Sequence, residues 1–150
     1  MADFTIDFHC EDGGRLPQHQ ELLHNWIVET ILAHGGQPGD INYIFCGDDY
    51  LHRLNVQYLS HDTLTDIITF PFGDFPLVSG DLFISTERVA DNARDRALPY
   101  VTELHRVVIH GVLHLCGQGD KTDEEAATMR RLEDQALLRR PDELTQPDER

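Results

Sequence analysis

The sequence has 150 residues, which is the size of one ordinary domain and long enough to build a core without disulfides. Its formal net charge of −15 excludes a broadly basic nucleic-acid-binding surface, so any contact with RNA must be made by local patches of cations. The 3 cysteines are widely spaced, which favours neither a disulfide framework nor a thiolate zinc site. No apolar run approaches the ~18 residues of a membrane span, and the first residues lack the pattern of a signal peptide. We therefore expect a cytoplasmic protein with no membrane partner.

The first half of the chain alternates between short strands and helices. Residues 4–8 alternate apolar and polar side chains, which predicts a half-buried strand. Apolar residues then recur at helical spacing over residues 19–34, before a turn rich in glycine and proline. Alternation returns over residues 40–46, and two aspartates before residues 50–58 are typical of a helix start.

The second half begins with strands and ends with helices. Residues 66–71 have strand composition and end in a proline, which suits an edge strand, and residues 79–85 predict a fourth strand. Helices are expected over residues 86–97 and 100–116, the first with a serine or threonine cap and the second after a proline. Thr122 and the acid three residues later form a capping box that predicts the last helix.

These elements predict the fold class. Four strands and about five helices, with the helices crowded into the second half, indicate a single α+β domain with a small four-stranded mixed sheet backed by helices. Residues 141–150 are polar and twice broken by proline, so we expect this acidic tail to be disordered and the domain to span residues 1–140.

The strongest chemical signal lies in the helix of residues 100–116 and the turn that follows it. His110 and His114 are four residues apart, so their imidazoles lie on one face of the helix and can converge on one ion. Gly117 can end the helix in a left-handed turn, which would carry Asp120 back toward both histidines. Two nitrogens and one carboxylate would bind a divalent cation, and three protein ligands leave a position open for water.

Other interpretations of this pattern remain open. Histidine pairs at helical spacing also occur on surfaces and in cores without a metal. Gly117 could serve only as a helix cap, and Asp120 could begin the next helix, since aspartate is a common N-cap residue.

The run from His110 to Gly117, His-Gly-Val-Leu-His-Leu-Cys-Gly, with the acidic turn after it, resembles the signature of the YbeY family. Two further blocks, residues 55–72 and 80–85, are similar to the family's segments around its central strands. Members are bacterial endoribonucleases of rRNA maturation that bind one zinc ion.

The resemblance implies a metal-dependent hydrolase domain over residues 1–140. It implies one Zn²⁺ per chain, held by His110, His114 and Asp120, whose bound water would serve catalysis. It also implies a single-stranded RNA substrate, maturation of the 16S rRNA 3′ end, ribosome quality control, and the small ribosomal subunit as partner.

Two positions depart from the family pattern. Most members resemble His-Gly-x-Leu-His-Leu-x-Gly-x-Asp-His, with a third histidine where this chain has Asp120. Many also carry an arginine directly after the tyrosine matched by Tyr58, whereas this chain has Leu59. The role of that arginine does not transfer, so either another arginine supplies the charge or the protein cleaves less well.

Three further residues are candidates for substrate contact. Arg106, four residues before His110, points toward the metal side of the helix and could bind phosphate, although a helix salt bridge is the alternative. His61 and Asp66 flank the first matched block and could position water or a ribose hydroxyl, although such loop residues also serve as caps and turns.

Two rival functions remain beside the endoribonuclease. Metzincin-like zinc proteases share the histidine frame, but they need a glutamate directly after the first histidine, where this chain has Gly111. A ribosome-associated binding factor with zinc and with weak or no cleavage is the other alternative, favoured by Leu59 and the acidity.

Overall fold

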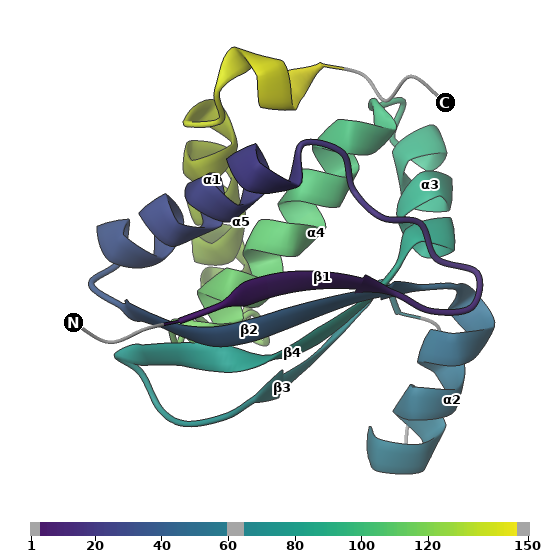
Figure 1. The fold of residues 1–150 in the computed structure, drawn as a ribbon, viewed down its shortest axis with the longest axis horizontal. Coiled ribbons are helices and arrows are strands. Elements are labelled where there is room, and N and C mark those ends of the chain that lie inside the picture. The colour runs from purple at the N-terminus through teal and green to yellow at the C-terminus, as the bar shows by residue number, and fades with distance from the viewer. Residues whose placement is uncertain (1–3, 60–64, 147–150) are drawn as a thin grey trace.

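A four-stranded mixed sheet organises the part of the chain that the computed structural model describes, residues 4–59 and 65–146. Its strands are β1 (Ile6–Cys10), β2 (Gln37–Cys46), β3 (Ile67–Pro71) and β4 (Leu77–Ser85), in the spatial order β1-β2-β4-β3. The helices are α1 (Gln20–Ala33), α2 (Asp48–Leu59), α3 (Thr86–Asp95), α4 (Tyr100–Leu115) and α5 (Asp123–Leu138), followed by a 3-10 helix, Asp142–Thr145 (Figure 1). The predicted α+β class with a small mixed sheet is confirmed.

The sheet is parallel except at one edge. β1 pairs with β2 and β2 with β4 in parallel, whereas β3 runs antiparallel to β4 and forms the edge. Proline cannot donate a ladder hydrogen bond, so Pro71 at the end of the edge strand fits the prediction for this segment.

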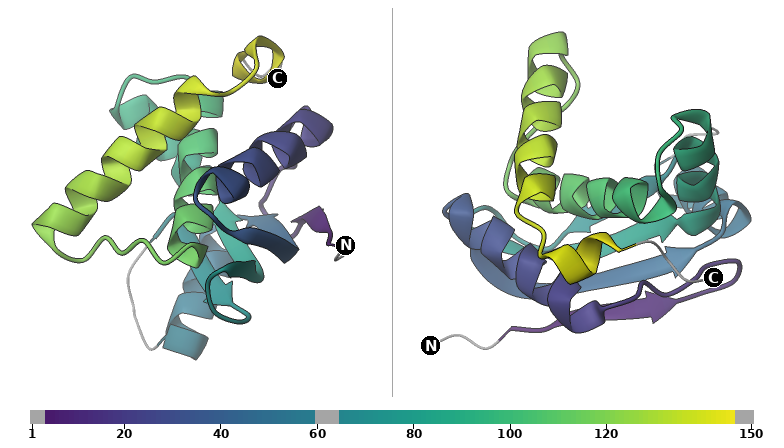
Figure 2. Two further views of the ribbon diagram at one scale, coloured as in Figure 1. Left: turned by 90° about the vertical axis from the view of Figure 1, so that its left-hand side faces the viewer. Right: turned by 90° about the horizontal axis from the view of Figure 1, so that it is seen from above.

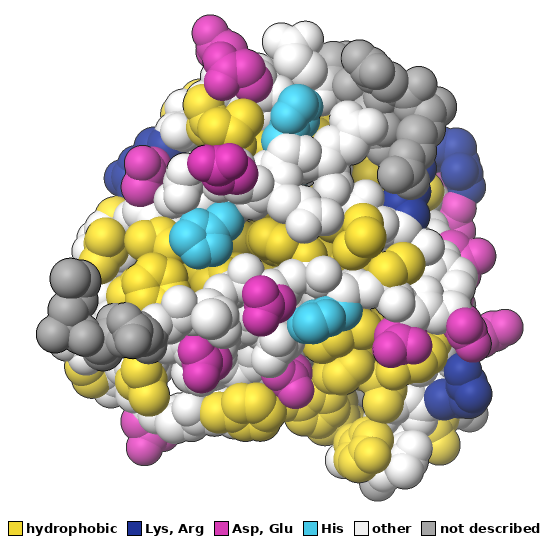
Figure 3. Space-filling view, in the orientation of Figure 1, with side chains coloured by type: hydrophobic (Ala, Val, Ile, Leu, Met, Phe, Trp, Pro, Cys, Tyr) yellow, Lys and Arg dark blue, Asp and Glu magenta, His cyan; other side chains and the backbone are white. Residues whose placement is uncertain are grey.

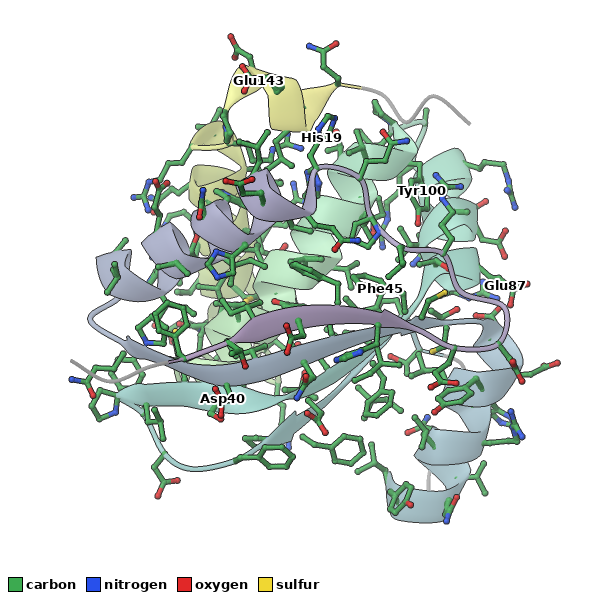
Figure 4. The ribbon with its side chains drawn as sticks, in the orientation of Figure 1. His19, Asp40, Phe45, Glu87, Tyr100 and Glu143 are labelled. Carbon is green, nitrogen blue, oxygen red and sulfur yellow. The ribbon has the colours of Figure 1, made fainter. Side chains whose placement is uncertain are left out.

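Side chains of alternate residues divide the sheet into two faces. Ile41, Tyr43 and Phe45 of β2 are fully buried against the helices, and Phe45 lies on that side of the sheet in Figure 4. The Tyr43 hydroxyl donates to the carbonyl of Val108 at 3.1 Å, which fixes α4 on this face. The opposite face carries a smaller apolar cluster beneath α2, centred on Leu51.

Helix α4 is the central helix of the larger layer. It packs against β3, β4, α1, α3 and α5, and α1 and α5 lie on the same side of the sheet (Figures 1 and 2). The Trp26 indole of α1 donates to the Ala136 carbonyl of α5 at 2.8 Å, which closes the layer over α4. The predicted central helix is therefore held on several sides, and its C-terminal end emerges beside the edge strand β3.

Several boundaries differ from the sequence prediction, among them the starts of β2 and β4, and tertiary contacts explain two of the differences. The first strand was expected over residues 4–8 but spans Ile6–Cys10, since its parallel pairing with β2 continues to Cys10. The tail 141–150 was expected to be disordered, yet residues 142–145 form the 3-10 helix and Leu144 is only 1% exposed. The last four residues, 147–150, lie outside the described residues.

None of the helices in the described segments combines the length and apolar character that crossing a membrane requires.

Candidate metal centre

The C-terminal end of α4 turns the chain back toward its own last turns. Gly117 has a φ of 94°, a left-handed conformation that glycine adopts without a Cβ penalty. Its N–H donates to the carbonyl of His114 at 2.9 Å, and the N–H of Gln118 donates to that of Leu113 at 3.0 Å. This pair of bonds is the Schellman motif, which confirms the predicted helix end at Gly117.

The turn brings Asp120 to the two histidines. Its Oδ2 lies 3.3 Å from Nε2 of His110 and 3.3 Å from Nε2 of His114. The two imidazole rings are nearly perpendicular, with centroids 4.6 Å apart. Thr122, not Asp120, caps α5 and forms the predicted capping box with Glu125, so the Asp120 carboxylate is available to face the histidines.

These three side chains fit a tetrahedral divalent cation. The three ligand atoms lie within 4.8 Å of one another, and no other group of this kind occurs among the described residues. Ligand bonds of about 2.0–2.1 Å in a tetrahedron place neighbouring ligand atoms about 3.3 Å apart, and both nitrogen-to-oxygen distances match that spacing. Two imidazole nitrogens and one carboxylate oxygen are a common donor set for zinc and similar ions.

A buried carboxylate from α5 orients the first of these histidines. Oε2 of Glu133 lies 2.7 Å from Nδ1 of His110, and the Glu133 side chain is only 6% exposed. With Nδ1–H donating to Glu133, the lone pair of Nε2 faces the centre, as a metal ligand requires. Burial opposes protonation of His110, but the hydrogen bond and charge of Glu133, with help from Asp120, outweigh it and raise the His110 pKa in the metal-free protein.

Glu133 was not singled out from the sequence, although its position carried a signal. It lies four residues from both Met129 and Leu137, which are buried on the same face of α5. An acid on the apolar stripe of a helix is uncommon unless it has a partner. The partner lies on α4, so the sequence alone could not name it.

Arg106 pairs with two carboxylates, as in the salt-bridge alternative, but these lie on another helix and not on its own. Its guanidinium donates to Oε1 of Glu133 at 2.9 Å and to Oδ1 of Asp134 at 2.7 Å. Both partners lie on α5, so the ion pairs join two helices. Two carboxylates neutralise the charge of Arg106 and its side chain is only 13% exposed, so we do not assign it the phosphate-binding role.

Two cavities meet at the metal centre. One of about 270 Å³ lies between α4 and α5, and one of about 800 Å³ lies along β3 and the end of α2. Asp66, Ile67, His110 and Asp120 line both of them. Desolvation by burial raises the Asp66 pKa, although the charge of His110 opposes this. Asp66 thus lies at the junction, whereas the other substrate-binding candidate, His61, lies outside the described residues.

Gly111 faces the sheet rather than the metal centre. A Cβ built at Gly111 would lie 2.2 Å from Cδ2 of Leu82 and 2.8 Å from Cδ1 of Ile67. A glutamate at this position would therefore have no room, and α4 can approach the sheet this closely because the residue is glycine. The site therefore has neither the glutamate that serves as general base in a metzincin protease nor the space to hold one.

Comparison with known proteins identifies the family of the chain. A protein-family model described as endoribonuclease YbeY matches residues 10–140. The chain belongs to the YbeY endoribonuclease family. It is 46% identical to a YbeY endoribonuclease of Flavobacterium johnsoniae and 50% identical to that of Flavobacterium psychrophilum, in each case over 88% of this chain and 94% of the relative. The solution structure of TM1509 from Thermotoga maritima shares the fold, with a TM-score of 0.62 and 27% identity, covering 89% of this chain and 87% of that one.

Proposed function

We propose that the protein is a zinc-dependent endoribonuclease that cuts single-stranded RNA. The observation that carries the proposal is the group of His110, His114 and Asp120 at the junction of two cavities. An RNA strand that lies along both cavities would pass the metal centre, and membership of the YbeY family supports RNA as the substrate.

The chain's own residues would hold and orient the reacting groups. When bound, a zinc ion would polarise a phosphoryl oxygen and lower the pKa of a coordinated water. Glu133 fixes the ring of His110, and Asp120 supplies the negative charge of the ligand set. Asp66 lines both cavities beside His110 and Asp120, so it lies where it can contact a ribose or a metal-bound group of the strand at the junction.

The family resemblance supports the biological setting. We place the protein in rRNA processing, at the 3′ end of 16S rRNA, and in ribosome quality control, with the small ribosomal subunit as its partner in the cytoplasm. Co-sedimentation of the protein with small subunits on sucrose gradients tests the partner, and sedimentation at the top of the gradient alone would count against it.

One experiment separates the candidate functions. Zinc content and cleavage of a single-stranded RNA and of its duplex are measured for the wild type, for His114→Ala, and for the control His34→Ala. His34 lies just beyond the end of α1 and lines neither cavity. We expect about one zinc per chain, with cleavage of the single strand lost only in His114→Ala.

Other outcomes point to the rival functions. Zinc in the wild type without cleavage of either RNA would overturn the nuclease and support a zinc-containing, ribosome-associated binding factor. Digestion of casein by the zinc-loaded wild type would revive the protease.

A further inference from the structure

Three arginines line the smaller cavity beside the metal centre. Arg96, Arg106 and Arg130 come from the end of α3, from α4 and from α5, and they share this cavity with His110 and Asp120. The chain has only 12 lysines and arginines against 27 acids, so a quarter of its cations gather at one cavity. Such a concentration in so acidic a protein needs a physical explanation.

Two of the three arginines are neutralised within the protein. Arg96 pairs with the buried carboxylate of Glu103 at 2.6 Å. Arg106 is held by Glu133 and Asp134. These pairs cancel the charges of the Glu103 and Glu133 carboxylates that line the same cavity, while Asp66 and Asp120 lie at the boundary with the larger cavity.

Arg130 is different, because no carboxylate of the described residues lies within salt-bridge distance of it. It is exposed to solvent on α5, one turn from Glu133, and it lines the cavity next to Ala126 and Met129. Its guanidinium therefore keeps its full set of donors for a ligand. The larger cavity carries one cation among its lining residues, Lys121, and the apolar Leu59 supplies no charge there.

We infer that the smaller cavity is a phosphate subsite, in which Arg130 binds a phosphodiester of the RNA strand next to the one held at the metal centre. This inference rests on the proposed function, because it assumes a strand that passes His110 and Asp120. A guanidinium with free donors can bind two phosphate oxygens at once, which gives both affinity and orientation. Leu59 carries no charge, and Arg130 supplies a positive charge from the opposite side of the centre.

The test compares two neighbouring arginines of α5. Arg130→Gln and Arg131→Gln remove the same charge from exposed positions, but of the two only Arg130 lines the cavity. Zinc content is measured for both variants as a check on the metal centre. The readouts are kcat and KM for single-stranded RNA, and the affinity for a short 2′-O-methyl RNA measured by fluorescence anisotropy at several KCl concentrations.

We expect Arg130→Gln to weaken RNA binding about tenfold, the lower end for a charge-assisted contact, because the side chain is exposed. KM should rise with little change in kcat. The slope of log affinity against log salt should fall by about 0.7, the value for one phosphate contact to a single strand. Arg131→Gln should change affinity less than about twofold, and Arg130→Lys should recover part of the loss.

Equal losses in the two variants, or no loss in either, would overturn the subsite. Cleavage that does not depend on Arg130 would overturn the subsite and leave the nuclease standing. Binding that depends on Arg130 without cleavage by the wild type would support the subsite and overturn the nuclease. A wild type that neither cleaves nor binds RNA would overturn both.

Discussion

Glu133 should control how tightly the protein holds its metal, although it is not placed to touch the ion. Glu133→Gln removes the negative charge that pairs with both His110 and Arg106, and Glu133→Ala removes the contacts as well. Asp134→Asn is the matched control, because Asp134 also pairs with Arg106 but is exposed and does not contact His110.

The contacts that each variant loses determine how much zinc affinity we expect it to lose. The loss of an outer carboxylate that orients a ligating histidine costs about 10–100-fold in metal affinity, which is about 1.4–2.7 kcal/mol. Glutamine keeps the length of the side chain and its carbonyl oxygen can still accept from Nδ1 of His110, so we expect about tenfold for Glu133→Gln. Alanine leaves the His110 ring unsupported and Arg106 with only Asp134, so we expect about 100-fold for Glu133→Ala.

The assay is competition for zinc with a chromophoric chelator, together with the visible spectrum of the Co²⁺-substituted protein. The spectrum reports ligand geometry independently of activity. Urea unfolding of the metal-free proteins separates a loss of metal affinity from a loss of the fold. If Glu133→Ala binds zinc as tightly as Asp134→Asn does, with an unchanged cobalt spectrum, Glu133 does not orient the ligand.

Three further predictions concern the scaffold. Gly111→Ala should lower the free energy of unfolding by about 1–3 kcal/mol, since the clash with Leu82 outweighs the gain of about 1 kcal/mol in helix propensity, and an unchanged urea midpoint would contradict the close packing. Leu144→Ala should cost about 2–5 kcal/mol in thermal or urea unfolding, whereas a negligible effect would mean that the tail does not pack. Burial, with Arg140 nearby, lowers the pKa of His105 from 6.5 to about 3. Below about pH 6.5 the unfolded state therefore binds a proton that the folded state does not. The contribution of His105 to the free energy of unfolding then falls by up to about 1.4 kcal/mol for each unit that the pH is lowered. His105→Gln should remove that part of the slope between about pH 6.5 and 5, and equal slopes for wild type and variant would refute it.

The parts of the site that the sequence predicted depend on local geometry. Two histidines one turn apart must share a face of a helix, and a glycine three residues past the second allows the left-handed turn that returns Asp120. The helices and strands were likewise predicted by periodicity, by the capping box at Thr122 and by the serine at the start of α3, whose side chain accepts from the N–H of Arg88. In each case a few neighbouring residues determine the outcome.

The parts that the sequence missed depend on contacts between distant segments. Glu133 and His110 are 23 residues apart, and only the packing of α5 against α4 brings them together. The same packing pairs Arg106 with two carboxylates of α5, which its position on the metal side of α4 did not predict. Residues 142–145 form a 3-10 helix because Leu144 packs in the core, which the polar residues around Leu144 gave no reason to expect.

An acidic protein can bind RNA if positive charge is concentrated at the binding site, even though the net charge of the protein is negative. Acidic side chains are spread over the face seen in Figure 3, with lysines and arginines mainly at its margins. At physiological ionic strength such exposed charges are screened beyond about 8 Å, so the net charge of −15 mainly slows approach at low salt. Within that distance a bound phosphate would interact mainly with the metal centre and Arg130, because the carboxylates of Glu103 and Glu133 are already paired with arginines. Raising the salt concentration should therefore weaken RNA binding rather than strengthen it by relieving repulsion. The slope of log affinity against log salt concentration should correspond to the small number of phosphate contacts.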